Sequence, residues 1–239
     1  MKLYLFALTF LLACSVCSAQ QLKVESKTIK NQDGKDIEAW VAHLDQEADE
    51  CMESYGDFMK KVFDLKPSKE NKTMMMVEKV QLNEMSGLRM DQRTFFITES
   101  GGTAVAFTFS PGYDIHFGTK LYSDEFERGE KLSKSFVKFH YKDFYNKKIK
   151  ELQKTLEDKQ EEITSDDKKI EKNKKSMLDN NKKINSGDSD AGKLRIRNDG
   201  LEKENMTMEG DIAKDKSDIK AFQDQLIKLH DSLRKVEEF

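Results

Sequence analysis

Apolar residues recur every seven positions through the C-terminal half of the chain. In the first run, one position of the repeat holds Ile149, Leu156, Ile163, Ile170, Met177 and Ile184. In the second run, one position holds Leu194, Leu201, Met208, Asp215, Phe222, Leu229 and Val236. Charged residues flank these positions, and no proline interrupts either run. A sustained period of seven predicts two coiled-coil helices, at about 124–185 and 191–238.

The two runs are separated by residues 186–191, which read Ser-Gly-Asp-Ser-Asp-Ala and are typical of a turn. A link this short joins antiparallel neighbours. The sequence therefore predicts a long antiparallel coiled-coil helical hairpin over residues 123–239. Folding the chain about the turn brings together residues whose numbers sum to 378, which places Ile184 opposite Leu194 and Leu156 opposite Phe222.

The same folding rule also pairs asparagines. Asn180 lies opposite Asn198, and Asn173 lies opposite Asn205. A buried Asn is satisfied only opposite another polar group, so it specifies register at a cost in stability. We therefore predict that these four residues form register-setting layers near the tip of the hairpin. In the alternative interpretation, they are half-exposed positions in a loose seam.

The middle of the predicted seam carries charges. Ile163 faces Asp215, Asp166 faces Ile212, and Lys159 lies one layer from Asp215. An ion pair between Lys159 and Asp215 would fit this spacing. Charged side chains at a seam position usually reach towards water, so we expect local looseness here rather than a functional site.

Residues 20–122 have a different pattern, with more aromatic residues and an alternation of period two. Strand-like segments lie at 22–29, 37–44, 74–82, 90–98 and 103–110. A helix from Asp45 to Leu65, with Asp45 as its N-cap, interrupts them and ends before Pro67. The order ββαβββ predicts a small α+β domain in which one helix covers an antiparallel sheet.

The first long helix is expected to begin near Ser123. Its early part carries aromatic residues, including Phe136 and Phe139, that are out of register with the later heptads. We predict that this aromatic face packs on the sheet and that the helix leaves the domain beyond Tyr145 as an arm.

The first 19 residues resemble a secretory leader. Lys2 precedes an apolar run from Leu3 through Ala13, and Cys17-Ser18-Ala19 follows as a small-residue site. Cleavage after Ala19 would place the protein in the periplasm or outside a bacterial cell. In a second interpretation the chain is a lipoprotein anchored at Cys14, because residues 11–14 resemble a lipobox. The apolar run is too short to cross a bilayer, and no later segment is apolar enough.

The cysteine count and the net charge exclude further classes of protein. Cleavage would leave Cys51 alone, so no internal disulfide is expected, and its apolar neighbours predict a buried thiol. The net charge is −3 although 36% of residues are charged. This balance argues against a nucleic-acid-binding protein, which would show a basic stripe.

Candidate chemistry is sparse. No histidine falls in a metal-ligand spacing, and no phosphate-binding glycine loop is present, so no cofactor or metal is predicted. The best local candidate is the segment after the last predicted strand, where Tyr113, Asp114 and His116 combine an aromatic ring, a carboxylate and an imidazole. This segment could bind a ligand, or it could be an ordinary loop.

The sequence therefore favours a non-enzymatic envelope protein whose coiled-coil arm docks an unknown protein or acts as a spacer. The alternative is a small-ligand or peptide-binding module that uses the N-terminal domain. The arms could also pair between two chains to form a homodimer, because an extended antiparallel dimer has the same layers as a hairpin.

Overall fold

The computed structural model describes residues 22–239, so the predicted leader, with Cys14 and Cys17, lies outside the described residues. The elements in chain order are β1 (Val24–Lys30), β2 (Asp36–Leu44), α2 (Ala48–Phe63), β3 (Ser68–Asn71), β4 (Met74–Val80), β5 (Met90–Glu99), β6 (Gly102–Ser110), α3 (Ser123–Asn185) and α4 (Ala191–Glu238). The chain divides into two compact units, one of residues 142–235 and the other of the remaining described residues. The predicted α+β class is confirmed.

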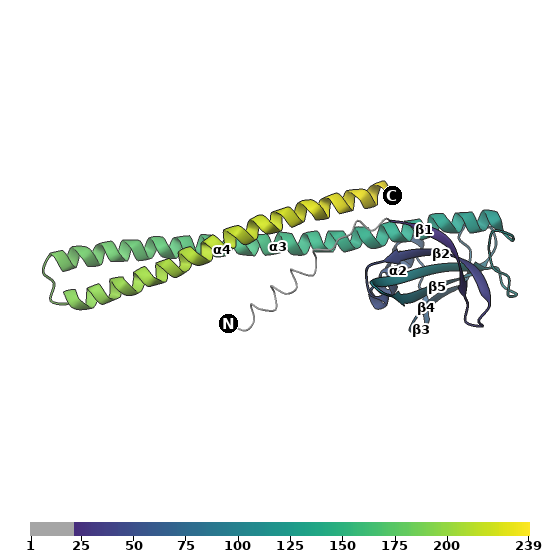
Figure 1. The fold of residues 1–239 in the computed structure, drawn as a ribbon, viewed down its shortest axis with the longest axis horizontal. Helices are drawn as coiled ribbons and strands as arrows, with labels where there is room; N and C mark the ends of the chain where they lie inside the picture. The colour runs from purple at the N-terminus through teal and green to yellow at the C-terminus, as the bar shows by residue number, and fades with distance from the viewer. Residues whose placement is uncertain (1–21) are drawn as a thin grey trace. The chain divides into compact units, whose positions relative to one another are not determined.

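The sheet has six strands in the order β1-β2-β6-β5-β4-β3, and every neighbouring pair is antiparallel (Figure 1). The central strands β5 and β6 pair from Asp91 with Ser110 to Glu99 with Gly102. Along β6, Val105, Phe107 and Phe109 alternate with Ala104, Ala106 and Thr108, as the period of two predicts. All six of these side chains are buried, so both faces of this strand are covered.

The sheet domain is held together by an aromatic core on one face of the sheet. Phe136 of α3 meets Tyr55 and Phe58 of α2 and Phe107 of β6, with ring centroids 5.5–5.7 Å apart. Tyr55 also meets Phe96 of β5 at 5.9 Å. All five rings are at most 1% exposed. The first part of α3 therefore packs on the sheet beside α2, as its aromatic residues predict.

Gly129 allows α3 to approach the sheet closely. A Cβ atom at this position would lie 2.7 Å from the Phe109 ring and 3.3 Å from the Trp40 ring. Trp40 stacks on Phe126 of the same helix at 4.9 Å, and its indole Nε1–H donates to the Phe126 carbonyl oxygen over 2.6 Å. A larger residue at 129 would push α3 away from both contacts.

The opposite face of the sheet has a smaller core. Ala39 and Val41 of β2 pack with Ala104 and Ala106 of β6, and all four are at most 3% exposed. Phe95 and Ile29 lie against this cluster. The small side chains in the middle of this face therefore pack against larger, partly buried ones.

Two details of the sheet domain differ from the sequence prediction. Strand β3 was not predicted, because Ser68–Asn71 reads Ser-Lys-Glu-Asn, has no apolar alternation and is fully exposed. Only its pairing with β4 and a register shift after Lys69 define it as an edge strand. The prediction of Asp45 as the N-cap of α2 is wrong: Glu47 is the N-cap, and its side chain makes no capping hydrogen bond.

Helices α3 and α4 form the predicted helical hairpin. The turn uses Gly187 at φ +82°, and the amides of Gly187 and Asp188 donate to the carbonyls of Ile184 and Lys183 over 3.2 Å each. These bonds satisfy the last carbonyls of α3, as in a glycine-ended helix. At the other end of α4, Val236 is 1% exposed, and Lys138 Nζ donates to the Glu237 carbonyl oxygen over 2.7 Å.

Candidate functional site

The hairpin seam between residues 142 and 235 contains an apolar cluster and several polar layers. Ile163 and Ile170 of α3 pack with Met208 and Ile212 of α4, and each is at most 7% exposed. Ile219 lies against this cluster. These residues are the heptad positions that the period of seven assigns to the seam, so the seam is formed by one stripe of each helix.

The structure brings both predicted asparagine pairs together. Asn180 Nδ2 donates to Asn198 Oδ1 over 2.8 Å, and Asn173 Nδ2 donates to Asn205 Oδ1 over 3.0 Å. Asn180, Asn198 and Asn205 are buried, and Asn173 is half-buried. Each pair therefore satisfies amide groups that would be costly to bury alone.

Two further residues complete these layers, and sequence reasoning missed both. Asn198 Nδ2 donates to Asn181 Oδ1 over 2.8 Å, and Asn173 Nδ2 also donates to Glu204 Oε2 over 3.2 Å. Asn181 and Glu204 flank the seam positions in the heptad, where a long side chain can reach the neighbouring helix. The heptad assignment could have suggested them, because a seam Asn has more hydrogen-bonding groups than one partner satisfies.

The middle of the seam contains an ion pair. Lys159 Nζ lies 2.7 Å from Asp215 Oδ1 and 3.2 Å from Glu162 Oε2. The side chain of Asp215 is only 13% exposed, and the hydrogen bond to Asp215 raises the pKa of Lys159. Asp166, the other predicted seam charge, pairs with Lys169 on its own helix at 2.8 Å. The charges are therefore compensated within the hairpin.

The segment with Tyr113, Asp114 and His116 forms a tight turn. Gly112 and Ile115 make an isolated β-bridge, and Tyr113 and Asp114 between them take φ values of +56° and +57°. Positive φ at two successive non-glycine residues is strained. The turn presents Tyr113 almost completely to solvent, with 97% of its surface exposed.

The structure does not join the three loop residues into one chemical group. Asp114 Oδ2 lies 3.1 Å from Lys35 Nζ, and among the hydrogen bonds of residues 22–239 there is none between Asp114 and His116. Burial and the nearby Arg93 lower the pKa of His116, which favours a neutral imidazole. Within the described chain no group of three or more His, Cys, Asp or Glu side chains could hold a metal ion.

A polar network on β1, β2 and β5 was not predicted from the sequence. His43 Nδ1 lies 2.8 Å from Glu99 Oε2, and its Nε2 lies 2.9 Å from Lys27 Nζ. Lys27 and Lys23 both pair with Glu25, and their hydrogen bonds lower the pKa of Glu25 to about 2. Lys23, Glu25 and Lys27 are close in the sequence, but only the sheet brings His43 and Glu99 to them, so sequence spacing gave no signal for the whole network. It is solvent-exposed, and it ties the end strand β1 to the rest of the sheet.

Cys51 is a buried thiol rather than a reactive one. It has no exposed surface, and its Sγ atom lies 3.7 Å from the Gln46 carbonyl oxygen. Burial raises the pKa of this thiol to about 12. Because the thiolate is the reactive form, Cys51 acts as a small core residue at neutral pH.

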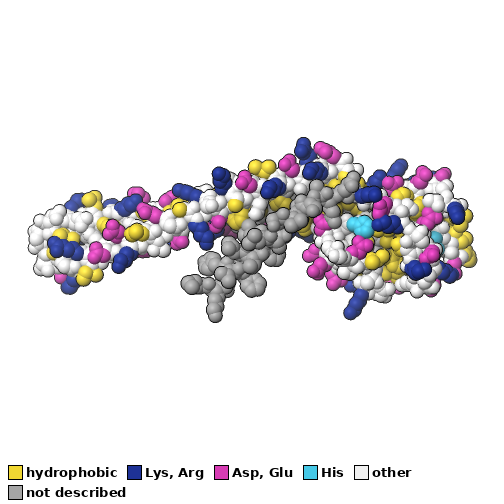
Figure 2. Space-filling view, viewed as in Figure 1, with side chains coloured by type: hydrophobic (Ala, Val, Ile, Leu, Met, Phe, Trp, Pro, Cys, Tyr) yellow, Lys and Arg dark blue, Asp and Glu magenta, His cyan; other side chains and the backbone are white. Residues whose placement is uncertain are grey.

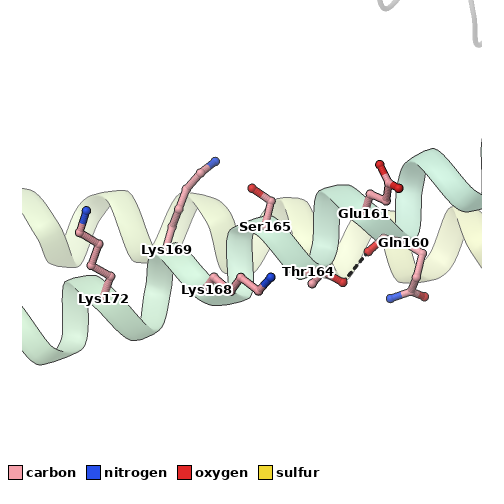
Figure 3. A pocket seen from close by; sticks show the side chains of 7 residues that line it. All are labelled: Gln160, Glu161, Thr164, Ser165, Lys168, Lys169 and Lys172. Carbon is pink, nitrogen blue, oxygen red and sulfur yellow. Dashed lines mark hydrogen bonds between the residues drawn. The ribbon is translucent and has the colours of Figure 1, made fainter.

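The outer face of α3 has a shallow depression of about 560 Å³. It is lined by Gln160, Glu161, Thr164, Ser165, Lys168, Lys169 and Lys172. Figure 3 shows these side chains along α3, with the ribbon of α4 behind the helix. The small Thr164 and Ser165 lie at its centre, Glu161 at one end and Lys172 at the other. The charges of the hairpin surface are mixed in sign along its length (Figure 2).

Comparison with protein-family models, curated proteins and solved structures finds no significant match to this chain. No helix among residues 22–239 is long and apolar enough to cross a membrane.

Proposed function

We propose that the protein is an exported, non-enzymatic envelope protein that uses its helical hairpin to dock another protein or to set a spacing. The observation that carries the proposal is the pair of bonded asparagine layers, Asn173 with Asn205 and Asn180 with Asn198. Apolar residues at these positions would stabilise the seam more, so the layers favour one register over maximal stability. A single register is useful where the hairpin must present its surface side chains at fixed positions.

The outer part of the hairpin also carries apolar side chains that its own seam does not use. Ile196, Met206 and Leu178 are 74%, 67% and 57% exposed. Single exposed apolar residues are common on protein surfaces, but a helix can also insert such side chains into an apolar groove of a partner protein. Periplasmic or secreted localisation is supported by the leader-like residues 1–19.

The second candidate function is binding of a peptide or small ligand by the sheet domain. It is favoured by one observation, the strained turn that holds Tyr113 in solvent with positive φ at Tyr113 and Asp114. Strain of this kind is often kept where a side chain has a task. The end strands of the sheet, β1 and β3, are a further place for peptide addition. However, β3 is short and bulged, and β1 carries Glu25 and Lys27, features that discourage added strands.

Affinity purification from native envelope extracts, with mass spectrometry, separates these functions. The bait is residues 20–239, and the first variant replaces residues 167–211 by a short glycine-asparagine turn. This cut joins Asp166 to Ile212, which face each other, and it keeps the pair Lys159–Asp215. Both asparagine layers and the exposed residues Leu178, Ile196 and Met206 are removed.

The second variant carries Tyr113→Gly and Asp114→Gly, which keep the positive-φ turn and remove its side chains. The proposal predicts a prey that the shortened hairpin loses and the glycine variant retains. A prey lost only by the glycine variant would contradict the proposal and assign binding to the sheet domain.

A further inference from the structure

The outer face of α3 carries a charge pattern that is complementary to itself. Counted over all faces of α3, residues 151–167 contain seven acidic residues and two lysines, whereas residues 168–183 contain seven lysines and two acidic residues. The depression at Thr164 and Ser165 lies at the boundary between these blocks. A surface that is mainly negative in one half and mainly positive in the other is complementary to a copy of itself that is turned end for end.

The match extends to individual positions of the heptad. The two outermost positions on α3 form a stripe that reads Glu151, Lys154, Asp158, Glu161, Ser165, Lys168, Lys172, Lys175, Asp179 and Lys182. When a second copy is laid antiparallel so that residue numbers sum to 333, opposite charges meet along the stripe. The four pairs are Glu151 with Lys182, Lys154 with Asp179, Asp158 with Lys175 and Glu161 with Lys172. Ser165 and Lys168 meet at the centre, beside the depression.

The side chains of this stripe are available for such a contact. All ten are exposed. Within the described residues, Lys154, Asp158, Glu161, Lys168, Lys172 and Lys175 form no ion pair. At the ends, Glu151 lies 3.7 Å from Lys148 and Lys182 lies 3.4 Å from Asp179, which are solvated contacts within one helix. Partner binding would therefore break few existing interactions.

We infer that two copies of this chain associate side by side through the outer faces of α3, with the two-fold axis at the depression between Thr164 and Lys169. Each residue pair then occurs twice, as an isologous contact requires. This inference rests on the proposed use of the hairpin as a docking element, and it names the partner as a second copy. The arrangement leaves both hairpin seams closed, which distinguishes it from a dimer that exchanges helices.

The contact is polar, so the association is weak and depends on salt. At about 10 mM salt the Debye length is about 30 Å and the eight ion pairs act together, whereas at about 1 M it is about 3 Å. A Kd on the order of 10–100 µM is expected at low salt. Sedimentation of residues 20–239, at protein concentrations that span this Kd range, should show a dimer at low salt. The dimer should dissociate at high salt.

Charge reversal tests the pairing at one position. Glu161→Lys or Lys172→Glu alone places like charges together twice, and each should weaken the dimer at least about tenfold. An equal mixture of the two single variants, and the double variant Glu161→Lys/Lys172→Glu, should both recover wild-type association. Lys203→Glu, the same charge change on an exposed residue of α4, is the matched control and should leave the dimer intact.

Three results would overturn the inference. These are a monomer at low salt throughout the concentration range, a dimer that ignores salt and the single reversals, and a mixture that fails to recover association. The second result would assign the dimer to exchanged helices. If the chain is monomeric but the shortened hairpin still loses a prey from envelope extracts, the docking function stands and only the second-copy partner is excluded.

Discussion

The sheet domain and the hairpin are stabilised in opposite ways. Phe136, Tyr55 and Phe107 pack with no exposed surface between helices and sheet, so shape alone distinguishes the correct arrangement of that core. The hairpin seam is one stripe wide and contains amide pairs and a Lys–Asp pair. If the seam held only aliphatic residues, one helix could slide along the other by a heptad and apolar side chains would still meet apolar side chains. We therefore expect the polar layers to give the hairpin the specificity of register that the sheet domain obtains from packing.

Removing the central ring of the domain should have the largest effect. Phe136→Ala deletes a fully buried ring that contacts α2 and β6, so the free energy of unfolding should fall by about 3–5 kcal/mol. Fluorescence of Trp40, the single tryptophan, reports the unfolding of this domain. Tyr113→Ala, which removes an exposed ring, is the control and should change little. An equal effect of both substitutions would contradict the assignment of the core.

Breaking the ion pair in the seam should have the next largest effect. Lys159→Met leaves the Asp215 carboxylate without its 2.7 Å partner, so the hairpin should lose about 1–3 kcal/mol of stability. Adding Asp215→Leu should recover the loss or exceed it, because a matched apolar layer replaces the pair. Because the pKa of Lys159 is raised on folding, the pair stabilises the protein below about pH 10.5 and ceases to do so as the pH rises through that raised value. Far-UV circular dichroism of the helices measures these changes; a double variant less stable than Lys159→Met would contradict them.

Substitutions in the asparagine layers should have a smaller effect on the stability of the hairpin. The sign of this effect should depend on whether one or both asparagines of a pair are replaced. Asn205→Leu alone leaves the half-buried Asn173 amide without its seam partner and should cost about 1 kcal/mol. The double variant Asn173→Leu/Asn205→Leu should melt at a higher temperature than the wild type. Thermal melting by circular dichroism checks both signs. A large fall for the double variant would show that the layer contributes to stability rather than to register.

The smallest expected effect is a dependence of the stability of the sheet domain on pH, through His116. Burial and Arg93 lower the pKa of His116 below its ordinary value of about 6.5, so the unfolded chain binds the proton more readily than the folded one. The stabilisation from neutral His116 is therefore complete above that value and is lost as the pH falls below it. Trp40-monitored unfolding at pH 7.5 and pH 5.5 should show a drop that His116→Gln reduces. An unchanged drop in the variant would assign the pH dependence to other groups.

Most of the fold could be predicted from periodicity, since the heptads define the hairpin and its facing residues, and the alternation in residues 103–110 defines the strand at the centre of the sheet. Strand β3 could not be predicted, because four exposed polar residues become a strand only by pairing with β4. The network of His43, Glu99 and Glu25 was missed for the same reason, since strand pairing brings distant residues together. Within the loop, the sequence showed Asp114 and His116 two residues apart but not that Lys35 would pair with the carboxylate.

The asparagine pairs were visible in the sequence because a helical hairpin has one folding parameter, the position of its turn. Once Gly187 is placed in the turn, the partner of each seam residue follows. The heptad placed Asn181 and Glu204 beside the seam as possible partners, but the structure was needed to show that their side chains bond to Asn198 and Asn173.

The register of the hairpin is the property to measure most directly. By the folding rule, Lys175 and Lys203 lie level with each other on the outer faces of the two helices, and both are exposed, so each can be replaced by a spin-labelled cysteine after Cys51→Ala. Pulsed electron–electron distance measurements should give one narrow distribution in the wild-type background. In a background with Leu at all four seam asparagines, slippage by one heptad would displace one label by about 10 Å along the helix axis, so the distribution should broaden or split. An equally narrow distribution at the same distance in that background would show that the asparagine layers do not set the register.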